Sequence, residues 1–433
     1  MAPAADLGFG PLAGSRPDGL AALGCLLAGQ PSGEATPWEL VVPLAVRHSL
    51  GPLLYWRATQ EPGGAALPAP LLEELRNDFY CAAARTMLAE GQLAELLAAL
   101  DEAKVPALVL KGAATGAFYP DPGLRAYTDL DFLVRDEQVG RAETVLRDLG
   151  YVPHPSPSWW QDHFQHLPPM ARPDGGLSVE VHWRTGPREG VGCLPVHDLW
   201  ARGVSWSLGP GTAQPALRLD DVDTALHLCQ HAAIQHRLRV GLRPLCDLAQ
   251  VVAGWDRGRW LTLSSRARAY GLDRAVDLVL ALADRWLSLD PPPDIARAWQ
   301  PLAPLLDAWL ARLAYPEAGA PAAMIVAGST TGHGARLRHL LRHLFLPRQG
   351  MALLYGIPAR SPLIWLAYAR RPIDLLRKHG EAMWHVLRGK EAARAAWNSE
   401  VWLERWLHGP DGANRGESPP GGQDRSAAGQ GAD

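Results

Sequence analysis

The stretch Thr128-Asp-Leu-Asp-Phe-Leu-Val134 alternates polar and apolar residues, a pattern typical of a β-strand with two different faces. Asp129 and Asp131 stand two positions apart, so both carboxylates project from the same face of that strand. The later segment Leu177-Ser-Val-Glu-Val-His-Trp183 alternates in the same way, and it directs Glu180 away from its apolar neighbours. The two segments therefore predict a pair of strands that carry three carboxylates.

A further strand and a phosphate-binding turn are predicted upstream. Val105-Pro-Ala-Leu-Val-Leu110 is a short apolar run that ends at Lys111-Gly112 and is followed by a stretch of small residues with helical character. Gly112 lets the backbone approach a ligand closely, and Lys111 offers a positive charge. Arg125, in the loop before the Asp pair, offers a planar fork for phosphate oxygens. Lys111, Gly112 and Arg125 are thus the candidate nucleotide-binding residues.

The rest of the chain is mainly helical by the spacing of its apolar residues. We expect an N-terminal helical region over residues 1–100, a core over residues 101–215 and a C-terminal helical region over residues 216–408. Residues 409–433 are rich in Gly, Ser, Pro and Asp and are expected to be disordered. The predicted fold class is α+β, with a small mixed sheet and its helices embedded between two helical regions.

Composition excludes several classes of protein. The 433 residues include 42 Lys or Arg and 45 Asp or Glu, a net charge of −3, which argues against a protein that coats nucleic acid by charge alone. Five cysteines without a Cys-x-x-Cys pair indicate neither a disulfide framework nor a thiolate zinc site. No apolar run approaches the roughly 18 residues that a membrane span needs, and no secretory leader is evident. We expect a cytoplasmic protein.

Charge is nevertheless uneven along the sequence. Residues 331–410 contain 13 Lys or Arg against 5 Asp or Glu, a net charge of +8. A helix in this region carries Trp365, Leu366, Leu375, Leu376 and Trp384 beside basic residues. The region could contact an acidic partner, such as a phosphate-rich molecule or a membrane surface, or it could be a solvated helix face.

The three carboxylates indicate a metal site. Asp129, Asp131 and Glu180 supply hard oxygen ligands, which suit Mg²⁺ or Mn²⁺. In a two-metal arrangement, one ion activates the attacking oxygen and the other stabilises the leaving pyrophosphate. Asp129, Asp131 and Glu180 are therefore both the candidate catalytic residues and the candidate metal ligands.

The order of these motifs resembles the polymerase-beta-type nucleotidyltransferase superfamily and, within it, a bacterial family of uncharacterised nucleotidyltransferases. The stretches that carry the resemblance are Leu110-Lys-Gly-Ala-Ala, Tyr119-Pro-Asp-Pro-Gly-Leu-Arg125, Asp129-Leu-Asp-Phe-Leu-Val-Arg135 and Val179-Glu-Val-His-Trp183. The likeness covers most of residues 37–380, and it implies the same three metal ligands and makes Gly112 the glycine of the nucleotide loop. One departure is that Ala113 stands where most of the superfamily has serine, so Lys111 or backbone amides would replace the hydroxyl contact to phosphate.

The resemblance implies a metal-dependent nucleotidyltransferase. It would transfer a nucleoside monophosphate from an NTP, with ATP the expected nucleotide and Mg²⁺ or Mn²⁺ the cofactor, to an unidentified acceptor, and it would release pyrophosphate by a two-metal mechanism. The alternative is a catalytically inactive protein that keeps the nucleotidyltransferase fold as a binding or adaptor module. The missing loop serine is compatible with that alternative, whereas the presence of all three carboxylates favours the enzyme.

Several other polar residues allow more than one interpretation. His227 and His231 have the i, i+4 spacing that places two imidazoles on one helix face, where they could bind zinc, line the nucleotide cleft or bond to neighbours. His182 shares the strand face of Glu180 and is a residue that supports a metal ligand, an acid/base group or a structural residue. Asp247 is expected to form an ion pair.

Overall fold

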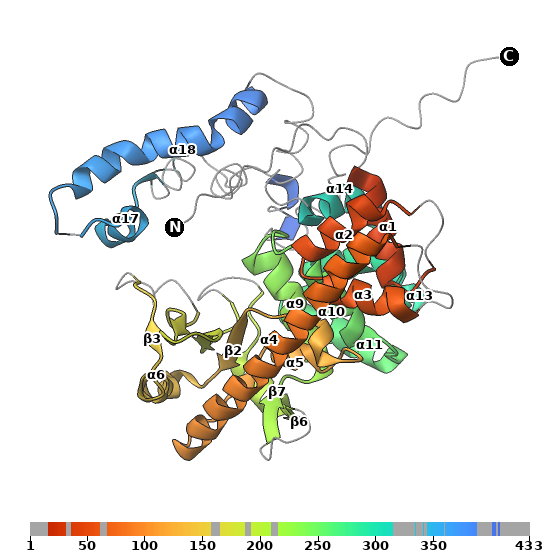
Figure 1. Cartoon of the computed structure of the whole chain (residues 1–433), viewed down its shortest axis with the longest axis horizontal. Helices are drawn as coiled ribbons and strands as arrows, with labels where there is room; N and C mark the ends of the chain where they lie inside the picture. Colours follow the sequence, from red (N-terminus) through yellow and green to blue (C-terminus); the bar gives the residue numbers. More distant parts are fainter. Residues whose placement is uncertain are drawn as a thin grey trace.

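The computed structural model describes residues 16–31, 36–60, 67–156, 165–186, 192–208, 215–314, 334, 341, 344–358, 360–387, 401–403 and 406–407. The tail expected to be disordered, residues 409–433, lies outside these ranges. Within them the fold is α+β, as predicted, with many helices around one mixed sheet (Figure 1). No described helix has both the length and the hydropathy that crossing a membrane requires.

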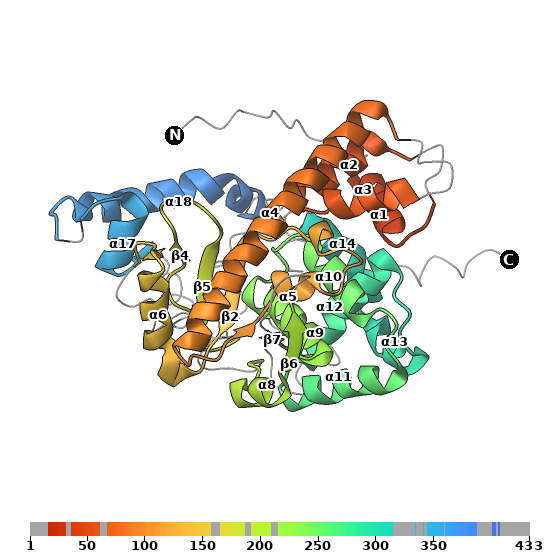
Figure 2. The same cartoon turned by 60° about the horizontal axis from the view of Figure 1, so that its bottom comes forward.

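Four helices precede the sheet: α1 (Arg16–Leu27), α2 (Trp38–Arg47), α3 (Gly51–Gln60) and α4 (Ala69–Glu102). Pro70 lies in the first turn of α4, where its missing N–H costs no intrahelical hydrogen bond. The 34-residue α4 is the long orange helix that runs from the other N-terminal helices to the sheet (Figures 1 and 2). Leu75 near its start packs with α1–α3, whereas Leu93 and Leu100 near its end pack under the sheet.

Seven strands form one sheet in the spatial order β3-β4-β5-β2-β1-β7-β6. Their bounds are β1 (Leu108–Val109), β2 (Asp129–Leu133), β3 (Val152–Pro153), β4 (Met170–Ala171), β5 (Ser178–His182), β6 (Val204–Ser207) and β7 (Pro215–Arg218). β2 lies between β1, to which it is antiparallel, and β5, to which it is parallel. The three strands predicted from apolar runs and alternation are β1, β2 and β5, so the predicted segments form the centre of the sheet.

Short helices connect the strands: α5 (Ala113–Gly116), the 3₁₀ turns η1 (Pro122–Leu124) and η2 (Asp136–Gln138), α6 (Val139–Asp148) and α8 (Val196–Arg202). α6 buries Ala142 and Leu146 against the same core as the second half of α4. Gly150 follows α6 with φ 86°, a left-handed conformation that ends a helix and that glycine adopts without strain.

The helices after the sheet are α9 (Asp221–Gln230), α10 (Arg243–Val252), α11 (Arg257–Ala269), α12 (Asp273–Leu287), α13 (Pro293–Trp299) and α14 (Ala303–Ala314), with a π-helical turn η3 (His231–Gln235) and a 3₁₀ turn η4 (Gln300–Leu302). They share one apolar core with α1–α3. Trp286 Nε1 donates a hydrogen bond of 2.8 Å to the Leu20 carbonyl, which ties α12 to α1. The helical regions expected before and after the sheet in the sequence thus pack on each other, because each presents an apolar face that is stable only when it is buried.

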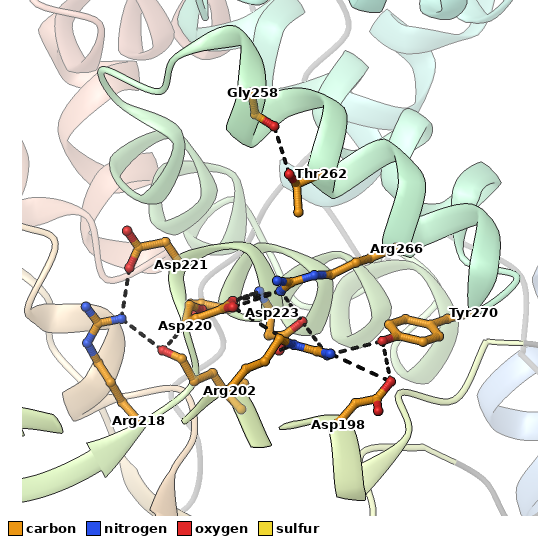
Figure 3. A network of polar contacts seen from close by, with 12 residues as sticks. Asp198, Arg202, Arg218, Asp220, Asp221, Asp223, Gly258, Thr262, Arg266 and Tyr270 are labelled. Carbon is orange, nitrogen blue, oxygen red and sulfur yellow. Dashed lines mark hydrogen bonds and ion pairs between the residues drawn. The ribbon is translucent and has the colours of Figure 1, made fainter. Parts of the chain in front are cut away.

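A network of arginines and carboxylates fixes the start of α9 (Figure 3). The Asp220 side chain accepts a hydrogen bond from the Asp223 N–H and so caps the helix. Arg202 at the end of α8 donates to both carboxylate oxygens of Asp223, at 2.7 and 3.1 Å, and Arg266 of α11 binds both Asp220 and Asp223. α9 is therefore held at its N-terminal end by side chains from two other helices.

The last two described helices stand apart from this body. α17 (Arg348–Tyr355) and α18 (Ile364–Leu387) lie at the periphery, in the half of the molecule that contains β3, β4 and β5 (blue in Figures 1 and 2). They pack mainly on each other around a small core of Met351, Ile364 and Ala367.

Candidate active site

Asp131 and Glu180 face each other across two parallel strands. β2 and β5 pair in a register that sets Asp131 opposite Glu180 and Asp129 opposite Ser178. Asp131 is 1% exposed, and Glu180 is partly exposed. The buried Oδ2 of Asp131 has no hydrogen-bond partner among the described residues. A buried carboxylate oxygen without a donor is costly, so this atom is placed to receive a cation.

His182 joins these two carboxylates. Its Nε2 lies 2.9 Å from Asp131 Oδ1 and 3.4 Å from Glu180 Oε2, and one ligand atom from each of the three residues lies within 4.8 Å of the others. Burial alone would lower the pKa of His182, but its hydrogen bonds to Asp131 and Glu180 raise it above the ordinary value. Sequence reasoning did not place His182 among the metal ligands, although its position two residues after Glu180 on the same strand face was the available signal.

Asp129 lies beside this group rather than within it. It is on the same strand face as Asp131, but the compact set of three ligand atoms in the described residues does not include its carboxylate. Burial and the neighbouring charge of Asp131 raise the pKa of Asp129 above its usual value. Of the three predicted ligands, the structure brings Asp131 and Glu180 together and leaves Asp129 next to them.

Lys111 is the cation that faces the carboxylates. Its Nζ lies 3.4 Å from Asp131 Oδ1 and 3.3 Å from His231 Nε2. Burial would lower the pKa of Lys111, but Asp131, Asp129 and Glu180 together raise it, so the side chain stays charged near neutral pH. In turn, burial would raise the pKa of Asp131, while Lys111 and His182 hold it well below its usual value. The predicted loop lysine is therefore part of the same electrostatic unit as the predicted ligands.

Gly112 forms the tight turn between β1 and α5. Its φ of 66° lies in the left-handed region, where residues other than glycine are strained. A Cβ at this position would also lie 3.4 Å from the Asp129 carbonyl oxygen. The glycine therefore lets the loop that carries Lys111 lie close to the strand that carries the aspartates.

Arg125 has a partner that its sequence position did not reveal. Its Nε and Nη2 donate to the two carboxylate oxygens of Asp247 at 3.1 and 2.8 Å, and Tyr119 Oη donates to Asp247 Oδ1 at 2.8 Å. Arg125 is 5% exposed. The fork expected to grip phosphate binds a buried carboxylate of α10, which is the ion pair expected of Asp247. This pair joins the loop before β2 to the helical body.

Three histidines lie near Lys111: His227 is buried, His231 is half-buried and His236 is exposed. His231 Nε2 lies 3.0 Å from His236 Nε2, and the His227 and His231 rings are 6.2 Å apart between centroids. Burial and Lys111 lower the pKa of His227 to about 3, so its imidazole is neutral. The sequence predicts one continuous helix here, but α9 ends at Gln230 and residues 231–235 form a π turn. In the described part of the chain, these histidines form no group with the geometry of a metal site.

The donor set suits a divalent cation that prefers oxygen. Within the described part of the chain, Asp131 offers an oxygen without a donor, and Glu180 is partly accessible. The surplus of negative charge is offset only in part by Lys111 and His182. Mg²⁺ is bound in proteins by one or two carboxylates together with water and substrate phosphates. The residues present therefore fit such an ion at Asp131 and Glu180, with Asp129 adjacent.

Comparison with known families agrees with this geometry. The profile of a family described as "Uncharacterised nucleotidyltransferase" matches residues 34–288, which is more than half of the chain and contains the whole sheet. The chain belongs to this family. No curated protein and no solved structure shows significant similarity to this chain. Membership implies an NTP substrate and a divalent metal, and the matched span ends just after α12, so α13, α14, α17 and α18 lie outside it.

Proposed function

We propose that this protein transfers a nucleoside monophosphate from an NTP, with ATP the expected nucleotide, to a hydroxyl or phosphate of an acceptor and releases pyrophosphate. Asp129, Asp131 and Glu180 would hold Mg²⁺ or Mn²⁺. The observation that carries the proposal is the pairing of Asp131 with Glu180 on adjacent parallel strands, where Asp131 keeps one buried oxygen that has no donor among the described residues. A carboxylate pair whose charge Lys111 and His182 offset only in part suits a divalent cation, and the family to which the chain belongs is one of nucleotidyltransferases.

In this proposal the acceptor oxygen forms a bond to the α-phosphorus of the NTP, and the bond from that phosphorus to the bridging oxygen of the leaving pyrophosphate breaks. The metal ions, when bound, would activate the attacking oxygen and offset charge on the leaving group. Lys111 would hold a phosphate oxygen of the NTP, because its charged Nζ lies beside Asp131 on the loop that Gly112 shapes. Most of the rate enhancement would come from positioning and electrostatics.

Arg125 enters the proposal as a positioning residue. Its bidentate contact with Asp247 fixes the loop that leads into β2 and so sets the place of Asp129 and Asp131. The direct contact with phosphate that the sequence suggested stays a prediction.

The first test is nucleotide binding. Isothermal titration of the full chain with non-hydrolysable NTP analogues, with and without Mg²⁺, should give binding of one analogue that depends on the metal. Asp131→Asn should abolish the metal dependence. Glu143→Gln on α6 is the matched control, because Glu143 is paired with Arg147 on the protein surface and its loss should leave binding unchanged. Metal-dependent binding that Asp131→Asn leaves intact would contradict the proposed site.

The second test is transfer itself. ATP labelled at the α-phosphate should mark the acceptor in a cell extract, whereas ATP labelled at the γ-phosphate should release its label as pyrophosphate. Labelling of a component from the γ-phosphate alone would indicate phosphoryl transfer by another enzyme. Labelling from the α-phosphate alone, lost with Asp131→Asn, is the expected result.

A second candidate function is a nucleotide-binding adaptor without catalysis. It is favoured by Ala113 at the position of the usual loop serine, and by Lys111, which already offers Asp131 a counter-charge within the protein. Such a protein would bind Mg-NTP and release no pyrophosphate with any extract. Release of pyrophosphate that depends on Asp131 would exclude it.

We also propose a cytoplasmic location for this activity. All five cysteines are free thiols, which is compatible with a reducing compartment. Cell fractionation with an antibody to the chain tests this location.

A further inference from the structure

α18 exposes an apolar face to solvent. Among its residues, Trp365 is 63% exposed, Leu366 65%, Ile373 51% and Leu376 59%. The opposite side of the helix is covered, because Ile364 and Ala367 are buried against α17. Of the residues singled out from the sequence, Leu375 is half-buried, and the side chain of Trp384 lies outside those that the structure describes. An exposed stripe of large apolar groups on a helix indicates an interaction surface.

The exposed residues follow helical periodicity and are bordered by arginines. Leu366, Ile373 and Leu376 recur at intervals of seven and three, which places them on one side of the helix. Arg370 and Arg377 are exposed along the border of the same side. We call this set of five residues the arginine-flanked face. It extends over about three turns, or about 16 Å.

The surroundings of this face are basic. Residues 348–378 contain six Lys or Arg and a single acidic residue, Asp374, whereas the whole chain has a net charge of −3. Asp374 is paired with Arg370 at 3.1 Å and accepts a hydrogen bond from Tyr355. Arg348 lies over the Trp365 ring at 5.3 Å from its centroid. Arg348, Arg370 and Arg377 are exposed, so positive charge lies beside the exposed apolar groups.

We propose that the arginine-flanked face binds an anionic lipid surface, with the axis of α18 lying in the membrane plane. α18 lies at the edge of the molecule (Figures 1 and 2), and the apolar side chains of the face are more than half exposed, so they are accessible to a bilayer surface. Helices of this kind insert apolar side chains about 5–10 Å into the headgroup region, while arginines on the flanks reach lipid phosphates. The inference is independent of the proposed transferase activity, since α18 lies outside the family match.

The test uses the full chain and vesicles of two compositions. Flotation with vesicles of phosphatidylcholine mixed equally with phosphatidylglycerol should carry the protein with them, and vesicles of phosphatidylcholine alone should not. Binding should weaken as salt is added, because the attraction of the arginines is screened. Arg370→Gln/Arg377→Gln should weaken binding by about fivefold for each arginine removed. Equal binding to both vesicle types, or no binding to either, would overturn the proposal.

A matched pair of triple variants distinguishes binding through this face from nonspecific hydrophobic adsorption to vesicles. Leu366→Ser/Ile373→Ser/Leu376→Ser should abolish flotation. Tyr80→Ser/Met87→Ser/Leu88→Ser on α4 removes three apolar groups of similar exposure, 60%, 74% and 73%, and should leave flotation unchanged. All six side chains are exposed, so circular dichroism should give the same spectrum for both variants as for the original chain. Flotation that survives in the α18 variant would rule out this face as the lipid contact.

The same proteins distinguish a second copy of the chain as the occupant of the face. Light scattering after gel filtration should give the mass of a monomer for the original chain in the absence of lipid. A dimer that the α18 variant converts to a monomer would mean that the face is covered by another copy, and the lipid proposal would be wrong.

Discussion

The ammonium group of Lys111 and the carboxylate of Asp131 form an ion pair of 3.4 Å at the centre of the candidate site. The Asp131 side chain is fully buried and that of Lys111 is 17% exposed, so neither charge is well solvated. The lysine therefore partly fills, inside the protein, the electrostatic role of a cation. Removal of the lysine charge should therefore make the stability of the site respond more strongly to added metal.

Lys111→Met tests that dependence. The substitution keeps the length of the side chain but leaves Asp131 with less compensation, so the free energy of unfolding in EDTA should fall by about 3 kcal/mol. Added Mg²⁺ should restore more stability in the variant than in the original chain, because the vacated charge can be supplied by the ion. Thermal melts with EDTA and with MgCl₂ measure both. Equal metal responses in the two proteins would argue against an ion at Asp131.

Asp131→Asn and Glu180→Gln should each reduce transferase activity by at least about 100-fold. Each replaces an anionic oxygen that faces the other across the paired strands by a neutral group of the same shape. The measurement is the rate of label transfer from α-labelled ATP once an acceptor is in hand. If activity falls with Asp131→Asn but not with Glu180→Gln, the essential carboxylates lie on β2 alone.

Arg125→Lys separates a positioning role from a phosphate contact. Lysine cannot donate the two parallel hydrogen bonds that Arg125 makes to Asp247, so the buried ion pair should be weakened. We expect the free energy of unfolding, measured with urea, to fall by about 2 kcal/mol. Asp247→Asn should destabilise the protein in the same way, although Asp247 is not a candidate phosphate ligand. If Arg125→Lys weakens NTP binding while stability is unchanged, Arg125 contacts the nucleotide directly.

Asp277 on α12 predicts a pH dependence of stability. Burial raises the pKa of Asp277 to about 6, against 3.8 for the unperturbed group. The folded chain therefore binds more protons than the unfolded chain between about pH 4 and pH 6, and the free energy of unfolding falls as pH rises through this window. The shift corresponds to a loss of about 3 kcal/mol at pH 7.

Asp277→Asn removes this loss. The amide oxygen can still accept the hydrogen bond from Trp299 Nε1, so the variant should be more stable than the original chain at pH 7 and equal to it below about pH 4. Urea unfolding at a series of pH values measures the difference. Asp307→Asn is the control, because Asp307 is exposed and pairs with Arg285 on the surface. If the free energy of unfolding of Asp277→Asn changes with pH in parallel with that of the original chain, Asp277 does not have a raised pKa.

The sequence was sufficient for the parts of the site that depend on local pattern. Alternation in β2 and β5 reports which face each residue occupies, so Asp131 and Glu180 could be assigned to strand faces without knowing how the strands pair. The contact of His182 with Asp131 depends on the register between strands about 50 residues apart, and alternation alone does not determine register. The same limit applies to Arg125, whose partner Asp247 comes from a helix beyond the sheet.

The helical regions illustrate the same difference between pattern and pairing. Periodicity predicted helices on both sides of the sheet, and they are present. It did not predict that α1–α3 share a core with α12 and α14, because an apolar face does not specify which other face will cover it. The π turn after Gln230 also escaped prediction, since its residues have no pattern that distinguishes it from a continued α-helix.

The long helix α4 contributes side chains to two apolar cores. Leu75 belongs to the core of the helical body and Leu93 to the core under the sheet, so one rigid rod is anchored in both. Neither core can melt while α4 stays intact without exposing part of its apolar face. The helical body and the sheet should therefore unfold as one cooperative unit, whereas α17 and α18, with a small core of their own, are free to unfold in a separate and earlier transition.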